Sequence, residues 1–175
     1  QDTTTTTNQE KETVHTEKFL SALVHAATYG SHTISSLSDT ARSGHIQFKE
    51  EGDARSALTI ADTSAQRIIV SSILGSYPNL HIVGEEDDSV EVDVEYQRVL
   101  RDDILVGHEW TTANVEKEQP PERLNLAEVT VFVDPLDGTR EFVEGRLSNV
   151  QSLIGVCYKG RPLMGVIGLP FPNEA

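Results

Sequence analysis

Apolar residues recur at helical spacing in two segments of the first half of the chain. From about residue 16 the apolar positions are Phe19, Leu20, Leu23, Val24, Ala27, Ile34 and Leu37. This spacing predicts an amphipathic helix, with an interruption expected at Gly30. A second helix is predicted to start at residue 62 or 63, with Asp62 as its N-cap, and to end at residue 74, before Gly75.

Shorter apolar runs of strand composition follow. The predicted strands are residues 80–83, 128–133, 150–158 and 162–167. The last two form a hairpin that turns at Lys159 and Gly160, and a short helix over 140–144 precedes Gly145. Residues 88–127 remain ambiguous, because their apolar positions favour a helix before Pro120-Pro121 marks a loop.

Length and cysteine content limit the class of protein. The chain has 175 residues, enough for one domain with a real core. Its only cysteine, Cys157, cannot form an intramolecular disulfide, so a reducing, cytoplasmic setting is expected. No apolar run reaches the roughly 18–20 residues of a spanning helix, and no membrane partner is expected. The polar, threonine-rich segment 1–11 is predicted to be disordered, which leaves 12–175 as the folded part.

Acidic residues dominate the charge of the chain, whose formal net charge is −14. This balance argues against nucleic-acid binding through a basic surface. Acids are concentrated in residues 85–103, a run whose ordinary interpretation is a solvated face or loop. An acidic site repels a phosphate ester unless bound cations reverse the local field, so phosphate chemistry here implies a metal.

The segment most indicative of function is Val-Phe-Val-Asp-Pro-Leu-Asp-Gly-Thr, residues 131–139. An apolar strand is expected to end at Asp134, followed by a turn that Pro135 makes rigid. Gly138 permits close approach of a ligand, and Thr139 begins a predicted helical turn whose free N–H groups face an anion. Two carboxylates beside such a helix end suit Mg²⁺-assisted phosphate chemistry. The same composition also fits a simple β-turn.

Gly84-Glu85-Glu86 has the same design, because a predicted strand runs into acids at its carboxyl end. Two such ends on neighbouring strands would gather Glu85, Asp134 and Asp137 around one cavity. Mg²⁺ prefers octahedral oxygen ligation and keeps water, so a few carboxylates and a carbonyl, such as that of Leu136, suffice. Taken alone, the two glutamates are better explained as an exposed acidic loop.

Asp62 has two interpretations. By position it caps the second predicted helix. The same carboxylate can accept a proton from a neighbouring hydroxyl, and with Thr139 it would form a dyad that orients a metal-bound water for in-line attack.

Three segments, in order, carry a family resemblance: Leu58-Thr59-x-Ala61-Asp62, residues 82–87 and residues 134–139. Together they resemble the lithium-sensitive, Mg²⁺-dependent phosphatases related to inositol monophosphatase, over about residues 12–175. The extension Arg140-Glu141-Phe142-Val143-Glu144-Gly145 looks most like the 3′(2′),5′-bisphosphate nucleotidase branch. The resemblance implies an α+β fold of layered helices and sheets, mostly antiparallel in this part, and a small phosphorylated substrate.

The resemblance also implies roles for individual residues. The implied metal ligands are Glu85, Asp134, the Leu136 carbonyl and Asp137, for two or three Mg²⁺ ions, with inhibition by Li⁺. Asp62 and Thr139 would activate water, and the N–H groups of Gly138 and Thr139 would hold the phosphate. Glu86 would lie behind the ligands. The implied reaction removes the 3′ (or 2′) phosphate of adenosine 3′(2′),5′-bisphosphate by direct attack of a metal-activated water.

The chain departs from the family pattern in two ways. The family usually has an acid six residues before the position of Asp62, where this chain has Ser56, and Asp53 is displaced. The family's second half, with a Trp-Asp motif that supplies another metal carboxylate, has no counterpart, since Trp110 is followed by Thr111. The resemblance therefore extends to about the N-terminal half of such an enzyme.

Three alternatives remain open. An inositol (poly)phosphate 1-phosphatase of the same superfamily would share every motif. An inactive, metal-binding fragment would account for the missing half. A haloacid-dehalogenase-type phosphatase has two acids two residues apart, whereas Asp134 and Asp137 are three apart, and this alternative leaves the Gly84-Glu85-Glu86 motif unexplained.

Overall fold

The computed structural model describes residues 12–42, 54–86 and 120–173, with the backbone alone described at 39–42 and 54–59. Its helices are α1 (Thr16–Arg42), α2 (Ala54–Ser76) and α3 (Thr139–Val143), with short 3₁₀ helices at Leu126–Glu128 and Leu147–Asn149. Its strands are β1 (Thr13–His15), β2 (His81–Gly84), β3 (Arg123–Asn125), β4 (Val129–Asp137), β5 (Gln151–Tyr158) and β6 (Arg161–Gly168). The predicted polar tail and most of the ambiguous 88–127 segment lie outside the described residues, as do Asp53, Trp110 and the side chain of Ser56.

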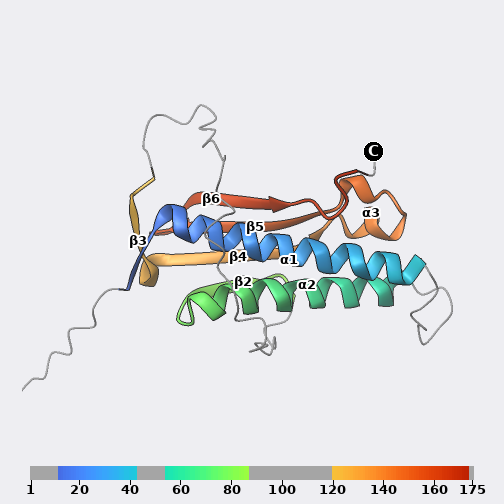
Figure 1. Ribbon diagram of the computed structural model, residues 1–175, viewed down its shortest axis with the longest axis horizontal. Helices are drawn as coiled ribbons and strands as arrows, with labels where there is room; N and C mark the ends of the chain where they lie inside the picture. Colours follow the sequence, from blue (N-terminus) through green and yellow to red (C-terminus); the bar gives the residue numbers. More distant parts are fainter. Residues whose placement is uncertain (1–11, 43–53, 87–119, 174–175) are drawn as a thin grey trace, which may run out of the picture.

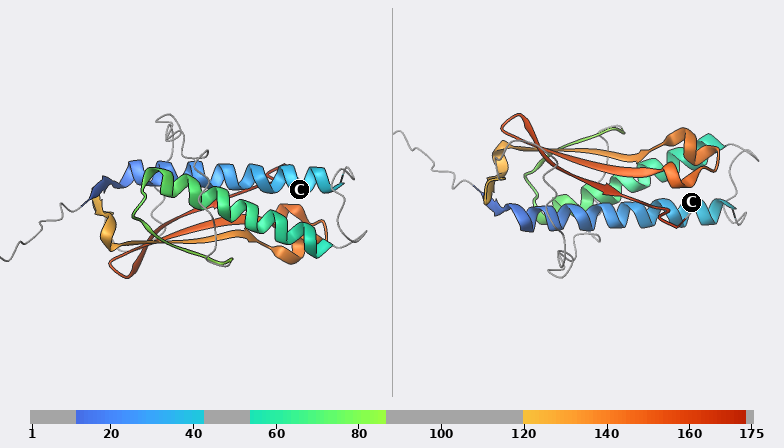
Figure 2. Two further views of the ribbon diagram at one scale, coloured as in Figure 1. Left: turned by 90° about the horizontal axis from the view of Figure 1, so that it is seen from below. Right: turned by 90° about the horizontal axis from the view of Figure 1, so that it is seen from above.

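Two layers make up this part of the molecule. Helices α1 and α2 run beside each other along one face of a four-stranded sheet of order β2-β4-β5-β6 (Figures 1 and 2). β2 and β4 are parallel, whereas β4, β5 and β6 pair antiparallel, and β1 with β3 forms a separate antiparallel pair. The predicted layered α+β fold with mostly antiparallel strands is confirmed, as are the β5–β6 hairpin and the short helix before Gly145.

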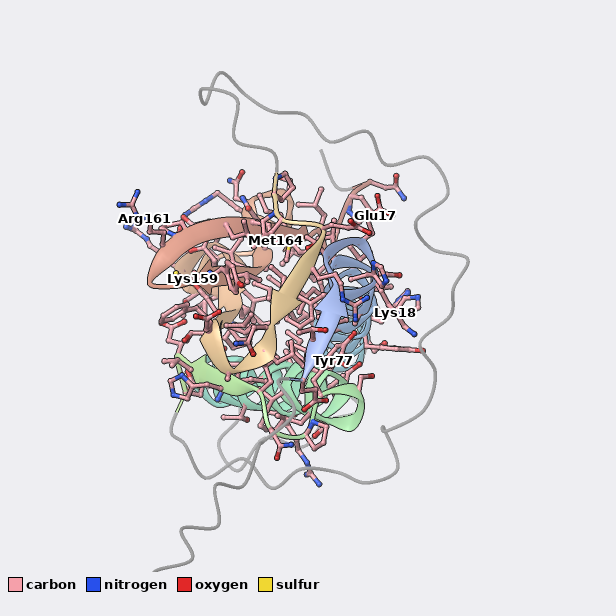
Figure 3. All side chains as sticks on the ribbon, turned by 90° about the vertical axis from the view of Figure 1, so that its left-hand side faces the viewer. Glu17, Lys18, Tyr77, Lys159, Arg161 and Met164 are labelled. Atoms are coloured by element: carbon pink, nitrogen blue, oxygen red, sulfur yellow. The ribbon has the colours of Figure 1, made fainter. Side chains whose placement is uncertain are left out.

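The interface between the layers is the main core. Val131 and Val133 of β4 and Ile154 of β5 face the helices, where they pack with Phe19 and Leu23 of α1. This alternation is what a sheet with one covered face requires. Figure 3, a view from the end opposite α3, shows side chains between the layers; Tyr77, labelled there, lies edge-on to Phe19 with ring centroids 5.2 Å apart.

The first helix has no interruption at Gly30, contrary to the prediction. A Cβ at Gly30 would lie 2.6 Å from Cδ1 of Ile69 on α2, which is closer than side chains approach. The glycine therefore permits the two helices to pack closely and does not break α1.

The second helix begins at Ala54, eight residues before its predicted start, and ends at Ser76 with Gly75 inside it. Asp62 is therefore in the helix interior, and its interpretation as an N-cap is wrong. The prediction failed because aspartate is more typical of helix starts than of interiors, whereas here tertiary packing places it on the buried face. This position needs an explanation other than capping.

β4 also extends further than predicted. The strand does not end at Asp134 but continues to Asp137, and its pairing with β5 shifts between these two residues. Pro135 lies in this irregular stretch, where its missing N–H removes no regular ladder bond. The shift replaces the predicted turn and re-aims the acidic end of the strand.

Candidate metal centre

The carboxyl ends of β2 and β4 bring the two acidic motifs together. These strands are parallel, with Gly84 paired to Val133. The N–H of Glu85 donates to the Val133 carbonyl at 3.0 Å, which extends the ladder by one residue. Glu85, just after β2, and Asp134, within β4, therefore lie on neighbouring strands, so the two acidic motifs meet at the same edge of the sheet.

Helix α2 supplies the third acid. Asp62 is only 8% exposed and lies one turn before Gln66, which is 1% exposed, so both face the protein interior. Their helix packs against β4 and places Asp62 within electrostatic range of Glu85, Glu86 and Asp134.

The charges of these acids act on one another. Burial raises the pKa of Asp62 from its ordinary 3.8 to about 7, reinforced by the negative charges of Glu86, Glu85 and Asp134 and by a hydrogen bond with the Glu86 carboxyl group. Burial likewise raises the pKa of Asp134 to about 6, with a hydrogen bond to Glu85 and the charges of Glu85 and Asp137 adding to the effect. Without a cation, the cluster retains protons near neutral pH.

The junction between β4 and α3 forms one side of this region. Gly138 has φ +87°, and a Cβ there would lie 2.7 Å from the Asn149 carbonyl oxygen, so the turn requires glycine. Thr139 begins α3, and its hydroxyl donates to the Leu136 carbonyl at 3.5 Å. Among the described residues no hydrogen bond joins Thr139 to Asp62, so the predicted dyad stays a prediction.

The donor set fits a hard divalent cation by its chemistry. The groups are carboxylates with a nearby carbonyl, the oxygen ligands that Mg²⁺ prefers. The Oδ1 atoms of Asp62 and Asp134 are buried and have no hydrogen-bond partner in the described part of the chain. Within those same ranges, however, no three acidic, histidine or cysteine side chains lie at metal-ligand spacing. A bound ion therefore needs the Leu136 carbonyl, water or small side-chain movements as well.

An open depression of about 310 Å³ adjoins the acids on the sheet face away from the helices. Its lining includes the apolar side chains of Val83, Phe132 and Leu153 together with the acids Glu85 and Asp134. The acids are thus reachable from solvent on this side.

Sequence reasoning missed one residue at this site, Gln66. Its side-chain amide bonds to both backbone groups of Glu86 at 3.0 Å. The spacing of four between Asp62 and Gln66 was a usable signal, because it places both on one face of a helix.

Comparisons with known proteins show which family the chain belongs to. Residues 15–175 match the sequence model described as the inositol monophosphatase family, and the chain belongs to this family. The 3′(2′),5′-bisphosphate nucleotidase 1 of Homo sapiens is 38% identical over 134 residues, which cover 74% of this chain and 40% of that protein. Inositol monophosphatase 3 of Danio rerio is 28% identical, with 93% of this chain and 46% of that protein covered.

Solved structures show the same fold. The suhB protein of Bartonella henselae aligns with a TM-score of 0.53 and 17% identity, over 89% of this chain and 44% of that one. CysQ of Bacteroides thetaiotaomicron aligns with a TM-score of 0.51 and 23% identity, over 88% and 42%. The chain thus spans less than half the length of these relatives. None of its described helices is long and apolar enough to cross a bilayer.

Proposed function

We propose that this chain is the metal-binding part of a Mg²⁺-dependent phosphomonoesterase that acts on a nucleoside 3′(2′),5′-bisphosphate. The observation that carries the proposal is the convergence of Asp62 on α2, Glu85 just after β2 and Asp134 on β4, where burial and the neighbouring acids raise the pKa values of both aspartates. Such perturbation of clustered acids is typical of functional sites. Membership of the inositol monophosphatase family supports the reaction class.

The proposed metal ligands are Glu85, Asp134, Asp137 and the Leu136 carbonyl. Bound Mg²⁺ would polarise the phosphate and make water a stronger nucleophile. In this proposal Asp62 accepts a proton at its buried Oδ1, which has no partner in the described part of the chain, and Thr139 at the start of α3 assists it. Glu86 lies behind the ligands, where its carboxyl group hydrogen-bonds to Asp62.

Substrate phosphate is proposed to bind at the Gly138–Thr139 backbone. The left-handed conformation of Gly138 directs the chain from β4 into α3, and it leaves no side chain over the amide groups. Li⁺ is proposed to compete for one of the Mg²⁺ positions, as the family resemblance implies.

The nucleotidase is favoured over the inositol phosphatase because the human nucleotidase is the more similar of the two relatives described, at 38% against 28% identity. The inositol phosphatase remains the second candidate. A metal-binding part without activity of its own is a third, supported by coverage of only 40% of the human protein. The cytoplasmic location also stays a proposal, and one relative, from Rattus norvegicus, is described as a Golgi-resident phosphatase.

Calorimetric titration of the chain with Mg²⁺ tests the assignment. The unmodified chain should bind Mg²⁺. Asp134→Asn should weaken that binding at least as much as the roughly 10- to 100-fold that is typical when a residue orienting a ligand is removed, because here the ligand itself is changed. Asp137→Asn should act in the same way. Glu128→Gln, which alters an exposed acid at the opposite end of β4, is the matched control and should bind as the parent does. Parent-like binding by a folded Asp134→Asn would refute the site.

A further inference from the structure

We propose that Gln66 is a positioning residue that fixes the distance between Asp62 on α2 and the Glu85-Glu86 pair after β2, and that it thereby sets the cation affinity of the cluster. The inference rests on the proposed function only in taking this cluster to be the cation site. Gln66 itself is not proposed to touch metal or substrate.

Gln66 holds the backbone of Glu86 by two hydrogen bonds, a contact that we call the Gln66–Glu86 clamp. Its Nε2 donates to the Glu86 carbonyl, and its Oε1 accepts from the Glu86 N–H, both at 3.0 Å. The side-chain amide therefore pairs with the Glu86 backbone as a neighbouring strand would. The residue is only 1% exposed, so water cannot readily replace either hydrogen bond.

Gly84 makes room for this clamp. A Cβ at Gly84 would lie 2.5 Å from Oε1, 2.6 Å from Cδ and 2.7 Å from Nε2 of Gln66. Any side chain at this position would displace the amide from Glu86. The glycine of the Gly84-Glu85-Glu86 motif thus permits the close approach of a helix side chain to the strand.

The two acids are held from opposite sides. The Glu85 N–H is bonded to Val133 of β4, whereas both backbone groups of Glu86 are bonded to Gln66 of α2. The pair therefore bridges sheet and helix. Because Asp62 lies one turn from Gln66 on the same helix, the clamp connects all three acids through one rigid element.

A fixed backbone is needed here because like charges repel. Asp62, Glu85 and Glu86 are acids within interaction range of one another, so those that ionise repel each other and would push an unanchored Glu85-Glu86 backbone outward. Holding ligands close together in advance removes that rearrangement from the binding step and raises affinity. Glutamine suits the task because it donates and accepts without adding a charge, whereas glutamate at this position would accept only and add to the repulsion.

The test compares Gln66→Met with Ile73→Val, which removes a buried methyl group from α2 away from the acids. Methionine keeps the approximate volume of glutamine and loses both hydrogen bonds. We expect Gln66→Met to weaken Mg²⁺ binding about 10- to 100-fold by calorimetry. Ile73→Val should lower thermal stability but leave Mg²⁺ affinity within about twofold, because it leaves the ligand partners intact. Equal affinity losses in the two variants would assign Gln66 a structural role only and overturn the proposal.

Amide hydrogen exchange supplies a metal-independent measurement. In Gln66→Met the Glu86 N–H should exchange faster, while the Glu85 N–H, bonded to Val133, should keep its parent rate. Gly84→Ala should reproduce this pattern, and Gly155→Ala, whose Cβ would meet nothing nearer than 3.9 Å, should not. Unchanged exchange at Glu86 would refute the clamp whether or not the parent binds Mg²⁺.

The outcomes separate this inference from the proposed function. The inference is overturned, and the proposed function stands, if the unmodified chain binds Mg²⁺ and Asp134→Asn weakens this binding but Gln66→Met does not. A parent that binds no Mg²⁺ overturns the function and, with it, any effect of Gln66 on affinity, while the exchange rates still decide whether Gln66 holds the loop.

Discussion

The carboxyl group of Asp62 is buried against the sheet beside three other acids, and one of its oxygens has no hydrogen-bond partner among the residues that the structure describes. Burial of this kind destabilises the charged form and thus the fold that contains it. Folded proteins keep such groups mainly at functional sites, where the unfavourable placement serves binding or catalysis. Since Asp62 does not cap its helix, capping does not explain why an acid lies at this buried position.

Asp62 makes stability depend on pH in a defined direction. Its pKa is raised from 3.8 to about 7 on folding, so the folded chain binds more protons than the unfolded chain between these values. Without divalent cations, the free energy of unfolding should therefore fall as pH rises from about 4 to about 7, and level off above. Denaturant titrations in EDTA across this range measure the slope.

The variant Asp62→Asn should remove the part of this slope that Asp62 contributes and leave the part that Asp134 contributes between about pH 4 and 6. Because asparagine cannot ionise, the variant should be more stable than the parent at pH 7.5 in EDTA, yet it should lose proton-accepting capacity in any active enzyme. Midpoints of thermal unfolding at pH 4.5 and 7.5 check the first expectation. A variant that is less stable than the parent at pH 7.5 would show that the Asp62 carboxylate stabilises the fold.

At the scale of elements, the junction of β4 and α3 is held by a backbone conformation that only glycine adopts easily. Gly138 has φ +87° and faces the Asn149 carbonyl, whereas Gly145 has φ +76° and faces open space. Gly145→Ala should therefore destabilise by about 1–2 kcal/mol through strain alone, and Gly138→Ala by more, because a clash is added. Urea unfolding measures the free energy of unfolding of both variants. Equal decreases would show that the Asn149 carbonyl moves aside without a further loss of stability.

Element types were predictable from the sequence, and element ends less so. Alternating apolar residues identified β4 and the β5–β6 hairpin, because one covered sheet face imposes a period of two. The start of α2 was predicted too late because aspartate is a common N-cap. The helix in fact continues through Asp62, which the packing of α2 against β4 places on the buried side. The meeting of Glu85 and Asp134 was predicted from two strand ends, but Gln66 was not, because its role depends on a contact between residues twenty apart in sequence.

At the scale of the whole molecule, helices α1 and α2 cover one face of the sheet, and apolar side chains are exposed elsewhere in the part that the structure describes. Large apolar side chains remain exposed, among them Ile167 at 64% and Leu169 at 55%. Exposed apolar surface of this kind favours association. We expect residues 1–175 to self-associate at micromolar concentration, and Ile167→Lys to shift the distribution toward monomer in sedimentation velocity experiments. A parent that stays monomeric would contradict this expectation.

Catalysis also depends on the molecule as a whole. In-line attack requires water, phosphorus and leaving oxygen to be fixed together, so a site needs groups on every side of the substrate. The described residues supply acids from α2, β2 and β4, but no three side chains among them already lie at metal-ligand spacing. The chain also aligns with only 40% of the human nucleotidase.

Residues 1–175 alone should therefore bind Mg²⁺ while releasing negligible phosphate from adenosine 3′,5′-bisphosphate. The measurement is phosphate release at saturating Mg²⁺, with the human nucleotidase at equal concentration as the positive control and inositol 1-phosphate as the second substrate. Mg²⁺ binding without turnover would mean that α2, β2 and β4 hold the cation and that orientation of the substrate depends on groups outside this stretch. Turnover comparable to the human enzyme would mean that these 175 residues contain a complete active site.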